Sequence, residues 1–218
     1  LGILVLELTY SLLREFPDTW WLGVGAVLLI VSIILTNLTP VLIFPIFYKV
    51  APLGEEYADL VNRLIRLAKR AGTEVLGVYK FNMSSRTKAA NAALMGLANT
   101  RRIVLGDTLL SKFSHDEIEA ILGHELGHHV RKDISISILA GSTITLGGLY
   151  FASVAMRWGV TMISLDSVSD VAGMPWLFLV LGVYQLATMP LGNTCSRWRE
   201  KGADAYALHS TGNGPAYA

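Results

Sequence analysis

Long apolar segments without charged residues constrain the fold of this 218-residue chain more than any other feature. The first, residues 20–48, opens with two tryptophans and contains no charged side chain. Residues 134–156 and 175–193 are equally free of charge, and about 20 apolar residues are enough for a helix to cross a bilayer. Residues 1–13 are a candidate remnant of a fourth span, although they include Glu7. The sequence therefore predicts a mainly α-helical multi-pass membrane protein.

The overall composition agrees with a membrane location and excludes other classes of protein. Only 16% of the residues are charged, against roughly 25% in soluble domains, and the mean hydropathy is +0.47. A net charge of +1 argues against nucleic acid as a partner, because no basic excess is present to neutralise phosphates. Cys195 is the only cysteine, so an internal disulfide framework is excluded. The chain does not begin with methionine and starts inside an apolar run, so we expect it to be a fragment.

A polar stretch between the first two apolar segments, residues 51–133, predicts a small α+β domain in water. Apolar residues at helical spacing predict a helix after Leu53 that stops at Gly72. Strand-like runs follow around residues 74–81 and 101–106, and residues 91–100 between them are typical of an edge strand that enters a turn.

The distribution of lysine and arginine predicts the orientation in the membrane. The loop over residues 157–173 has one arginine and two aspartates, whereas basic residues are frequent in the polar stretch and after the last apolar segment. The positive-inside rule therefore places both basic regions in the cytoplasm. The predicted organisation is N-terminal membrane helices at 1–50, a cytoplasmic α+β domain at 51–133, a membrane helical hairpin at 134–195 and a further helix at 196–218.

The stretch FSHDEIEAILGHELGHHVRKD contains the chemistry-bearing motif HELGH on a predicted helix. Ser114 and Glu117 form a capping-box pattern at its start. His124 and His128 are four residues apart, so both rings leave one face of the helix and can bind one metal ion. Glu125 is adjacent to the first histidine, where it can take a proton from a water molecule on the metal. Two imidazoles, one carboxylate and an open position suit zinc.

A second segment, SRWREKGADAYAL, offers the third protein ligand that such a site needs. Glu200 and Asp204 are four apart on one helix face, with Arg197 one turn earlier. Glu200 can complete the zinc shell, and Asp204 can accept the free N–H of a ligand histidine. The alternative is a juxtamembrane helix whose charges form ordinary pairs at this spacing.

These motifs, taken in order, resemble a known family. HELGH, two apolar segments and SRWREKGADAYAL are similar to the integral-membrane zinc metallopeptidases of the type I CAAX prenyl endopeptidase family and its bacterial heat-shock protease relatives. NAALMGLANTRRIVLGDTLL resembles two consecutive features that precede the zinc helix in that family. They are a strand with an Asn-Ala pair and a segment with the pattern RIVLxDTLL. LTPVLIFPIFYKVAPL resembles the segment that enters its catalytic domain, and the likeness extends over residues 20–210.

The resemblance implies a zincin-like α+β metallopeptidase domain at 51–133. It also implies one zinc ion per chain, bound by His124, His128 and Glu200, with Glu125 as catalytic base and acid. We therefore expect a zinc-dependent, CAAX prenyl protease-like membrane endopeptidase that hydrolyses peptide bonds by a zinc-activated water. Its partners would be the lipid bilayer and a peptide or protein substrate, prenylated or membrane-embedded. The location would be the cell membrane of a prokaryote or the endoplasmic reticulum membrane of a eukaryote.

The resemblance also implies roles for residues around the metal. Asn91 and Ala92 would lie on an edge strand, where substrate main chain pairs by β-addition. Arg197 and Asp204 would support the site structurally or electrostatically. This sequence departs from the family's pattern in two ways. The eukaryotic enzymes have more membrane spans, arranged around a large chamber, and the family's sequences continue beyond the helix that contains ADAYAL.

Three alternatives accompany this interpretation. A quality-control metalloprotease for membrane proteins, without prenyl specificity, fits the same residues. An intramembrane metalloprotease also has HExxH, but here charged residues flank the motif on both sides. A non-enzymatic zinc-stabilised scaffold would have no use for Glu125, which ligates nothing in the expected shell.

Overall fold

The computed structural model describes residues 2–38, 44–85, 87, 91–96 and 101–212. The chain divides into two compact units, which we name the helical unit and the sheet unit. The helical unit comprises Leu1–Ile34 and Ser135–Ser196, and the sheet unit comprises Leu35–Ile134 and Arg197–Ala218. Two long helices, α7 and α8, contribute residues to both units.

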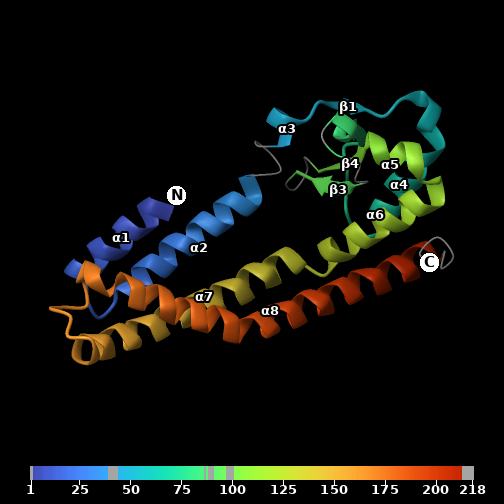
Figure 1. Cartoon of the computed structure of the whole chain (residues 1–218). Coiled ribbons are helices and arrows are strands. Elements are labelled where there is room, and N and C mark those ends of the chain that lie inside the picture. The colour runs from blue at the N-terminus through green and yellow to red at the C-terminus, as the bar shows by residue number, and fades with distance from the viewer. Residues whose placement is uncertain (1, 39–43, 86, 88–90, 97–100, 213–218) are drawn as a thin grey trace. The chain divides into compact units, whose positions relative to one another are not determined.

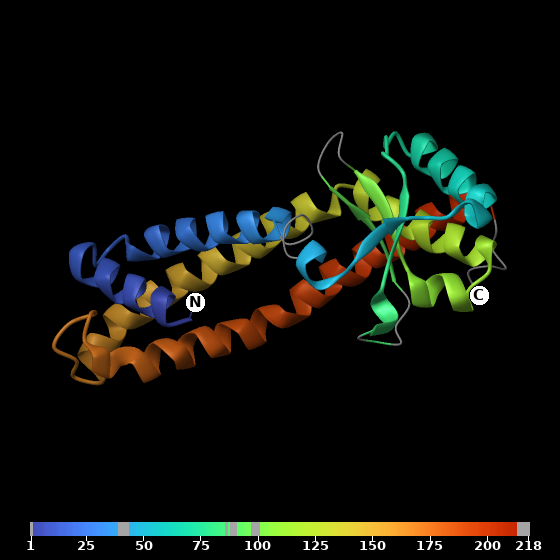
Figure 2. The ribbon, with the colours of Figure 1, turned by 90° about the horizontal axis from the view of Figure 1, so that it is seen from above.

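The helical unit is an all-α arrangement around an apolar core. Its helices are α1 (Gly2–Glu15), α2 (Trp20–Leu38), α7 (Asp133–Met162) and the first part of α8 (Met174–Thr211). Helices α1 and α2 lie side by side (Figures 1 and 2). The core is built from buried side chains of all four helices: Tyr10, Leu13, Trp20, Val24, Leu149, Ala152, Met156, Leu177 and Val180.

Two helices of the described chain are long and apolar enough, by length and composition, to cross a membrane. They are Asp133–Met162 and Val171–Thr211, and they contain the predicted spans 134–156 and 175–193. The predicted span 20–48 contains a shorter apolar helix, Trp20–Thr36, and residues 39–43 of that span lie outside the described part of the chain. The expected kink at Pro40 lies outside the described residues. The candidate remnant at 1–13 forms α1, which is not one of the two candidate spans.

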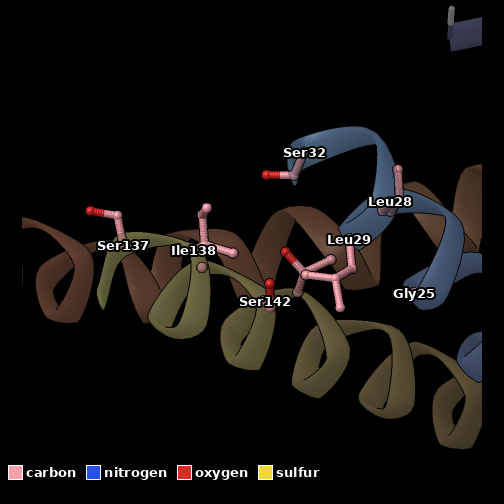
Figure 3. Close-up of a pocket in the computed structure, with 9 residues that line it drawn as sticks. Gly25, Leu28, Leu29, Ser32, Ser137, Ile138 and Ser142 are labelled. Carbon is pink, nitrogen blue, oxygen red and sulfur yellow. The ribbon is translucent and has the colours of Figure 1, made fainter. Parts of the chain in front are cut away.

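Small residues let α2 and α7 approach each other closely. A Cβ at Gly25 would lie 2.3 Å from the Leu146 side chain, so α2 has no room there for a larger residue. Beside this contact a hollow of about 180 Å³ is lined by glycine, leucine and hydroxyl side chains, among them Ser32, Ser137 and Ser142 (Figure 3). The small residues of 134–156 also permit close packing, since a Cβ at Gly147 or Gly148 would lie 2.7 or 2.9 Å from the Tyr184 side chain of α8.

The sheet unit contains a four-stranded sheet of order β1-β2-β4-β3. The strands are β1 (Val50–Pro52), β2 (Val78–Phe81), β3 (Ala92–Met95) and β4 (Arg102–Gly106). Strands β2 and β4 are parallel, whereas β1 and β3 pair antiparallel with them at the two edges. The prediction that β3 is an edge strand is therefore confirmed, and the strands expected at 74–81 and 101–106 correspond to β2 and β4. Strand β1 was not predicted.

Helices α4 (Ala58–Arg70), α5 (Asp107–Lys112) and α6 (His115–Val130) pack with the sheet into one core (Figure 1). The predicted helix after Leu53 corresponds to α4, and Gly72 beyond its end has the positive φ of +66° that favours glycine. Ile103 and Leu105 of β4 are fully buried beneath Leu64 of α4 and Leu122 of α6. The core thus fixes α6 on the sheet.

The remaining elements are short. Helix α3 (Phe44–Phe47) precedes β1, and single 3-10 turns occur at Glu55–Tyr57, Met83–Ser85 and Val171–Gly173. The predicted helix at 196–218 is the end of α8, which closes at Thr211; residues 213–218 lie outside the described part of the chain.

Candidate metal centre

Helix α6 begins with the predicted capping box. The Ser114 hydroxyl accepts a hydrogen bond from the Glu117 backbone N–H, and the Glu117 carboxylate accepts one from the Ser114 backbone N–H at 2.7 Å. The hydrogen bonds that the Ser114 backbone N–H and hydroxyl donate to the Glu117 carboxylate hold the pKa of that carboxyl below its usual value. Ile118, Leu122 and Leu126 are buried in the core, so the helix is fixed in rotation. The core therefore fixes the directions in which the side chains of HELGH leave the helix.

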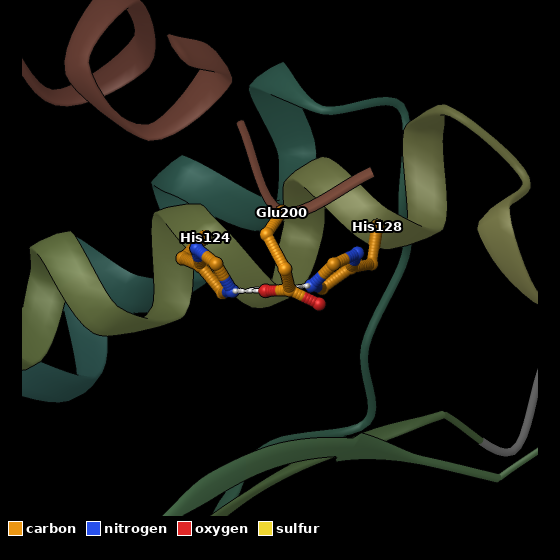
Figure 4. A group of neighbouring side chains, drawn as sticks. All are labelled: His124, His128 and Glu200. Atoms are coloured by element: carbon orange, nitrogen blue, oxygen red, sulfur yellow. Dashed lines mark hydrogen bonds and ion pairs between the residues drawn. The ribbon is translucent and has the colours of Figure 1, made fainter. Parts of the chain in front are cut away.

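The two motif histidines point their Nε2 atoms at each other from successive turns of α6. These atoms lie 3.1 Å apart. Glu200 of α8 reaches the same point, with its Oε2 atom 3.4 Å from His124 Nε2 and 3.6 Å from His128 Nε2 (Figure 4). The structure thus brings together three residues from two segments that are far apart in the sequence.

The spacing of these three atoms fits a divalent metal ion. Ligand atoms about 2.0–2.1 Å from a tetrahedral ion lie roughly 3.3 Å from one another. The three separations of 3.1, 3.4 and 3.6 Å are close to that value. The donor set of two imidazole nitrogens and one carboxylate oxygen is also that of known metal sites in hydrolases. His124, His128 and Glu200 can therefore hold a metal ion without rearrangement of the backbone.

Each histidine is oriented by a carboxylate on its other ring nitrogen. His124 Nδ1 lies 2.8 Å from Asp204 Oδ1, as expected from the sequence, and His128 Nδ1 lies 2.8 Å from Asp133 Oδ2. A carboxylate can only accept here, so Nδ1 carries the proton and the Nε2 lone pair is free for a metal. Sequence reasoning missed Asp133. The carboxylate five residues after the second histidine was the only signal for it.

Close packing of α6 against α8 brings Glu200 to the histidines. A Cβ at Gly127 would lie 2.9 Å from Ala203 Cα, and one at Gly123 would lie 3.3 Å from Ala207 Cα. Both alanines are fully buried. Gly123, directly before HELGH, and Gly127 within it thus leave room for α8 to approach α6 closely.

Glu125 lies on α6 directly after His124 and is partly buried. Burial raises the pKa of its carboxyl and the negative charge of Glu200 adds to this, while His124 and His128 oppose it. A carboxyl whose pKa is raised binds a proton more readily than an exposed one, which suits a group that accepts and returns a proton.

His129 is next to the motif but is not part of this constellation. The structure places His129 half-buried near the end of α6. Burial lowers its pKa, and the positive charge of Arg101 contributes in the same direction. A neutral imidazole is therefore favoured at this position.

The remaining predicted site residues lie in different surroundings. Arg197 is exposed, and it makes no hydrogen bond or ion pair with any residue that the structure describes. Asn91 is exposed immediately before β3, and its carbonyl oxygen accepts a hydrogen bond of 2.9 Å from the Gly106 N–H. Ala92 is buried as the first residue of β3 and belongs to the core that includes α6. Asn91 is thus exposed at the start of an edge strand, where its side-chain amide can contact a ligand.

Comparison with known proteins agrees with this geometry. The sequence profile described as Peptidase family M48 matches residues 55–217, which is most of the chain and includes every residue of the metal centre. The chain belongs to peptidase family M48. The resemblance to CAAX prenyl endopeptidases and their bacterial heat-shock relatives is thereby confirmed.

Relatives within M48 match most of this chain. An uncharacterised metalloprotease, YhfN of Bacillus subtilis, is 33% identical over 208 residues, covering 94% of this chain and 48% of that protein. The probable CAAX prenyl protease 1 of Schizosaccharomyces pombe is 28% identical, over 90% of this chain and 42% of that protein. Protease HtpX of Legionella pneumophila is 29% identical, over 76% of this chain and 57% of that protein.

A solved structure has the same fold. The crystal structure of S. mikatae Ste24p superposes with a TM-score of 0.75 at 25% sequence identity, and the match covers 96% of this chain and 52% of that one. The chain thus spans about half the length of the first relatives it matches. Its fold is that of a mostly helical M48 protein with a small sheet.

Proposed function

We propose that this protein is a zinc-dependent membrane endopeptidase whose metal is bound by His124, His128 and Glu200. The observation that carries the proposal is the convergence of His124 Nε2, His128 Nε2 and Glu200 Oε2 within 3.1–3.6 Å of one another. Membership of a peptidase family supports a protease, and the donor set favours zinc over harder cations, which prefer all-oxygen sites.

The catalytic role of each residue follows from which of its atoms would bind the metal and which contact a neighbouring carboxylate. When bound there, zinc would acidify a water molecule and polarise the scissile carbonyl. Glu125 ligates nothing in this arrangement, and it would take a proton from the attacking water and return it to the leaving amine. His124 and His128 would keep their Nδ1 protons on Asp204 and Asp133, so that both rings stay neutral and oriented.

The substrate would bind along the edge strand β3. Strand β3 pairs on one side with β4, and no described strand pairs with its other side. An extended peptide can add to such an edge through main-chain hydrogen bonds. Asn91, exposed at the start of the strand, would anchor the substrate main chain through its amide, with Ala92 next to it. Arg197 would act on the site electrostatically.

The membrane and the substrate class complete the proposal. Helices α7 and α8 would cross the bilayer as a hairpin, and the basic residues would keep the sheet unit in the cytoplasm. Several relatives are described as CAAX prenyl protease 1, which favours a prenylated peptide. Protease HtpX, matched over more than half its length, favours the second candidate, a protease without prenyl specificity.

The test is peptide cleavage by purified protein in detergent. A farnesylated CAAX peptide, the same peptide without farnesyl, and an unfolded model protein would be incubated with and without a zinc chelator. The proposal expects cleavage that the chelator abolishes and added zinc restores. Preference for the farnesylated peptide would select the prenyl protease, and equal cleavage of unfolded protein would select the second candidate. Cleavage that persists without metal would contradict both.

A further inference from the structure

We propose that Asp133 orients His128 for metal binding, and that it contributes more to metal affinity than Asp204 contributes through His124. This inference rests on the proposed function, since it concerns the same metal. Both carboxylates are 2.8 Å from an Nδ1 atom, so the two contacts are equal in length. They differ in their surroundings.

Burial distinguishes the two aspartates. The Asp133 side chain is 4% exposed, whereas the Asp204 side chain is 46% exposed. A charged hydrogen bond shielded from water is stronger than one that water competes for, because the local dielectric is lower. An exposed pair between charged groups contributes little. The Asp133–His128 contact should therefore hold its ring more firmly than the Asp204–His124 contact does.

The backbone turns Asp133 toward α6. Lys132, the residue between α6 and α7, has a positive φ of 56°, which interrupts the helix after the C-cap residue Arg131. Asp133 is the first residue of α7, and a carboxylate is favoured at a helix N-terminus by the helix dipole. Asp133 thus begins α7 and also hydrogen-bonds to His128 in the last turn of α6.

Arg131 connects this carboxylate to the helix that carries Glu200. Its Nε atom is 3.9 Å from Asp133 Oδ1, and its guanidinium lies over the Trp198 ring, 4.7 Å from the centroid. A Cβ at Gly202 would come within 2.2 Å of Arg131 Cζ, so glycine makes room for this packing. Trp198 and Gly202 flank Glu200 on α8. One side chain therefore joins the partner of His128 to the segment that supplies the third ligand.

The experiment compares zinc affinity in matched variants of the whole chain. Zinc dissociation constants would be measured by chelator competition for the wild type, Asp133→Ala, Asp133→Asn and Asp204→Ala. Asp59→Ala is the control, because Asp59 is an exposed acid in the first turn of α4. We expect Asp133→Ala to bind zinc about 10–100-fold more weakly, and by a larger factor than Asp204→Ala. Asp133→Asn should restore part of the affinity, since its amide oxygen can accept the Nδ1–H.

Two further readouts separate orientation from folding. Circular dichroism of the metal-free variants should match the wild type. The absorption spectrum of the Co²⁺-substituted protein should change in Asp133→Ala and remain unchanged in Asp59→Ala. If Asp133→Ala fails to fold, Asp133→Asn decides, because weaker zinc binding by that folded variant supports the proposal and wild-type affinity overturns it.

The outcomes distinguish this inference from the proposed function. A wild-type protein that binds no zinc would refute the proposed function itself. Wild-type zinc binding together with unchanged affinity in Asp133→Ala, or a smaller loss than in Asp204→Ala, would overturn only the role of Asp133.

Discussion

Replacing Gly127 by alanine should weaken metal binding by forcing α6 and α8 apart. The new Cβ would lie 2.9 Å from Ala203 Cα and 3.0 Å from Ala203 O, both of them backbone atoms that no side-chain rotation can move. Ordinary carbon contacts are about 3.5–4.0 Å long, so the helices must separate locally by roughly 0.5–1 Å. Glu200 is three residues before Ala203 on α8, so its carboxylate should move with that helix.

Gly127→Ala should lower zinc affinity as well as stability. Overpacking costs about 1–3 kcal/mol. Alanine in a helix interior gains up to about 1 kcal/mol over glycine, which offsets part of that cost. Metal–ligand distances tolerate only about ±0.2 Å, less than the required displacement. We therefore expect zinc affinity to fall by about tenfold or more, and the free energy of unfolding to fall by about 0–3 kcal/mol.

Chelator competition in detergent would measure this, with two further glycine variants for calibration. A Cβ at Gly182, also on α8, meets nothing within 4 Å, so Gly182→Ala should leave zinc affinity unchanged. The loss of zinc affinity in Gly123→Ala should lie between the losses in Gly127→Ala and Gly182→Ala, because the nearest backbone atom to its new Cβ, Ala207 Cα, is 3.3 Å away. Wild-type zinc affinity in Gly127→Ala would refute the idea that this helix contact positions Glu200.

Three further perturbations test other parts of the structure. Asn91→Ala should impair cleavage while zinc content stays unchanged; loss of zinc would make Asn91 a structural residue, and an unchanged rate would remove it from the site. Ser114→Ala removes the cap of α6 and should lower the free energy of unfolding by about 1 kcal/mol, measured by denaturant titration, with no change expected if the cap is dispensable. In a Cys195→Ser background, a cysteine at Ser167 should react with an impermeant reagent on intact cells and one at Thr87 only after lysis; labelling of both from one side would contradict the proposed topology.

The sequence predicted the elements that carry strong local signals. The capping pattern at Ser114 marked the start of α6, and alternating or continuous apolar runs marked β2 and β4. Spacing on one helix face paired His124 with His128, and the same argument placed Glu200 with Asp204. These features depend on neighbours within a few residues, which a single sequence displays directly.

The missed features depend on contacts or backbone geometry without a local signal. Strand β1 is only three residues long, all three residues are exposed, and it contains Pro52, so it shows no alternation of buried and exposed residues. The contact between Asp133 and His128 requires the positive φ of Lys132, a residue type that seldom adopts it. Helix α8 is continuous from Met174 to Thr211 and includes Pro190, whereas the sequence predicted a span at 175–193 and a separate helix from residue 196.

The central claim is that Glu200 binds the metal while Glu125 moves the proton, and the amide variants of these two residues test it most directly. Zinc content and peptide cleavage would be measured on the same purified samples. Glu125→Gln keeps the shape of the side chain but not the base, so zinc should remain near one per chain while hydrolysis falls by at least about 10²–10⁴-fold. Glu200→Gln replaces an anionic ligand with a weak neutral one, so zinc itself should be lost, with partial recovery in excess metal. Full zinc and full activity in Glu200→Gln would contradict the account.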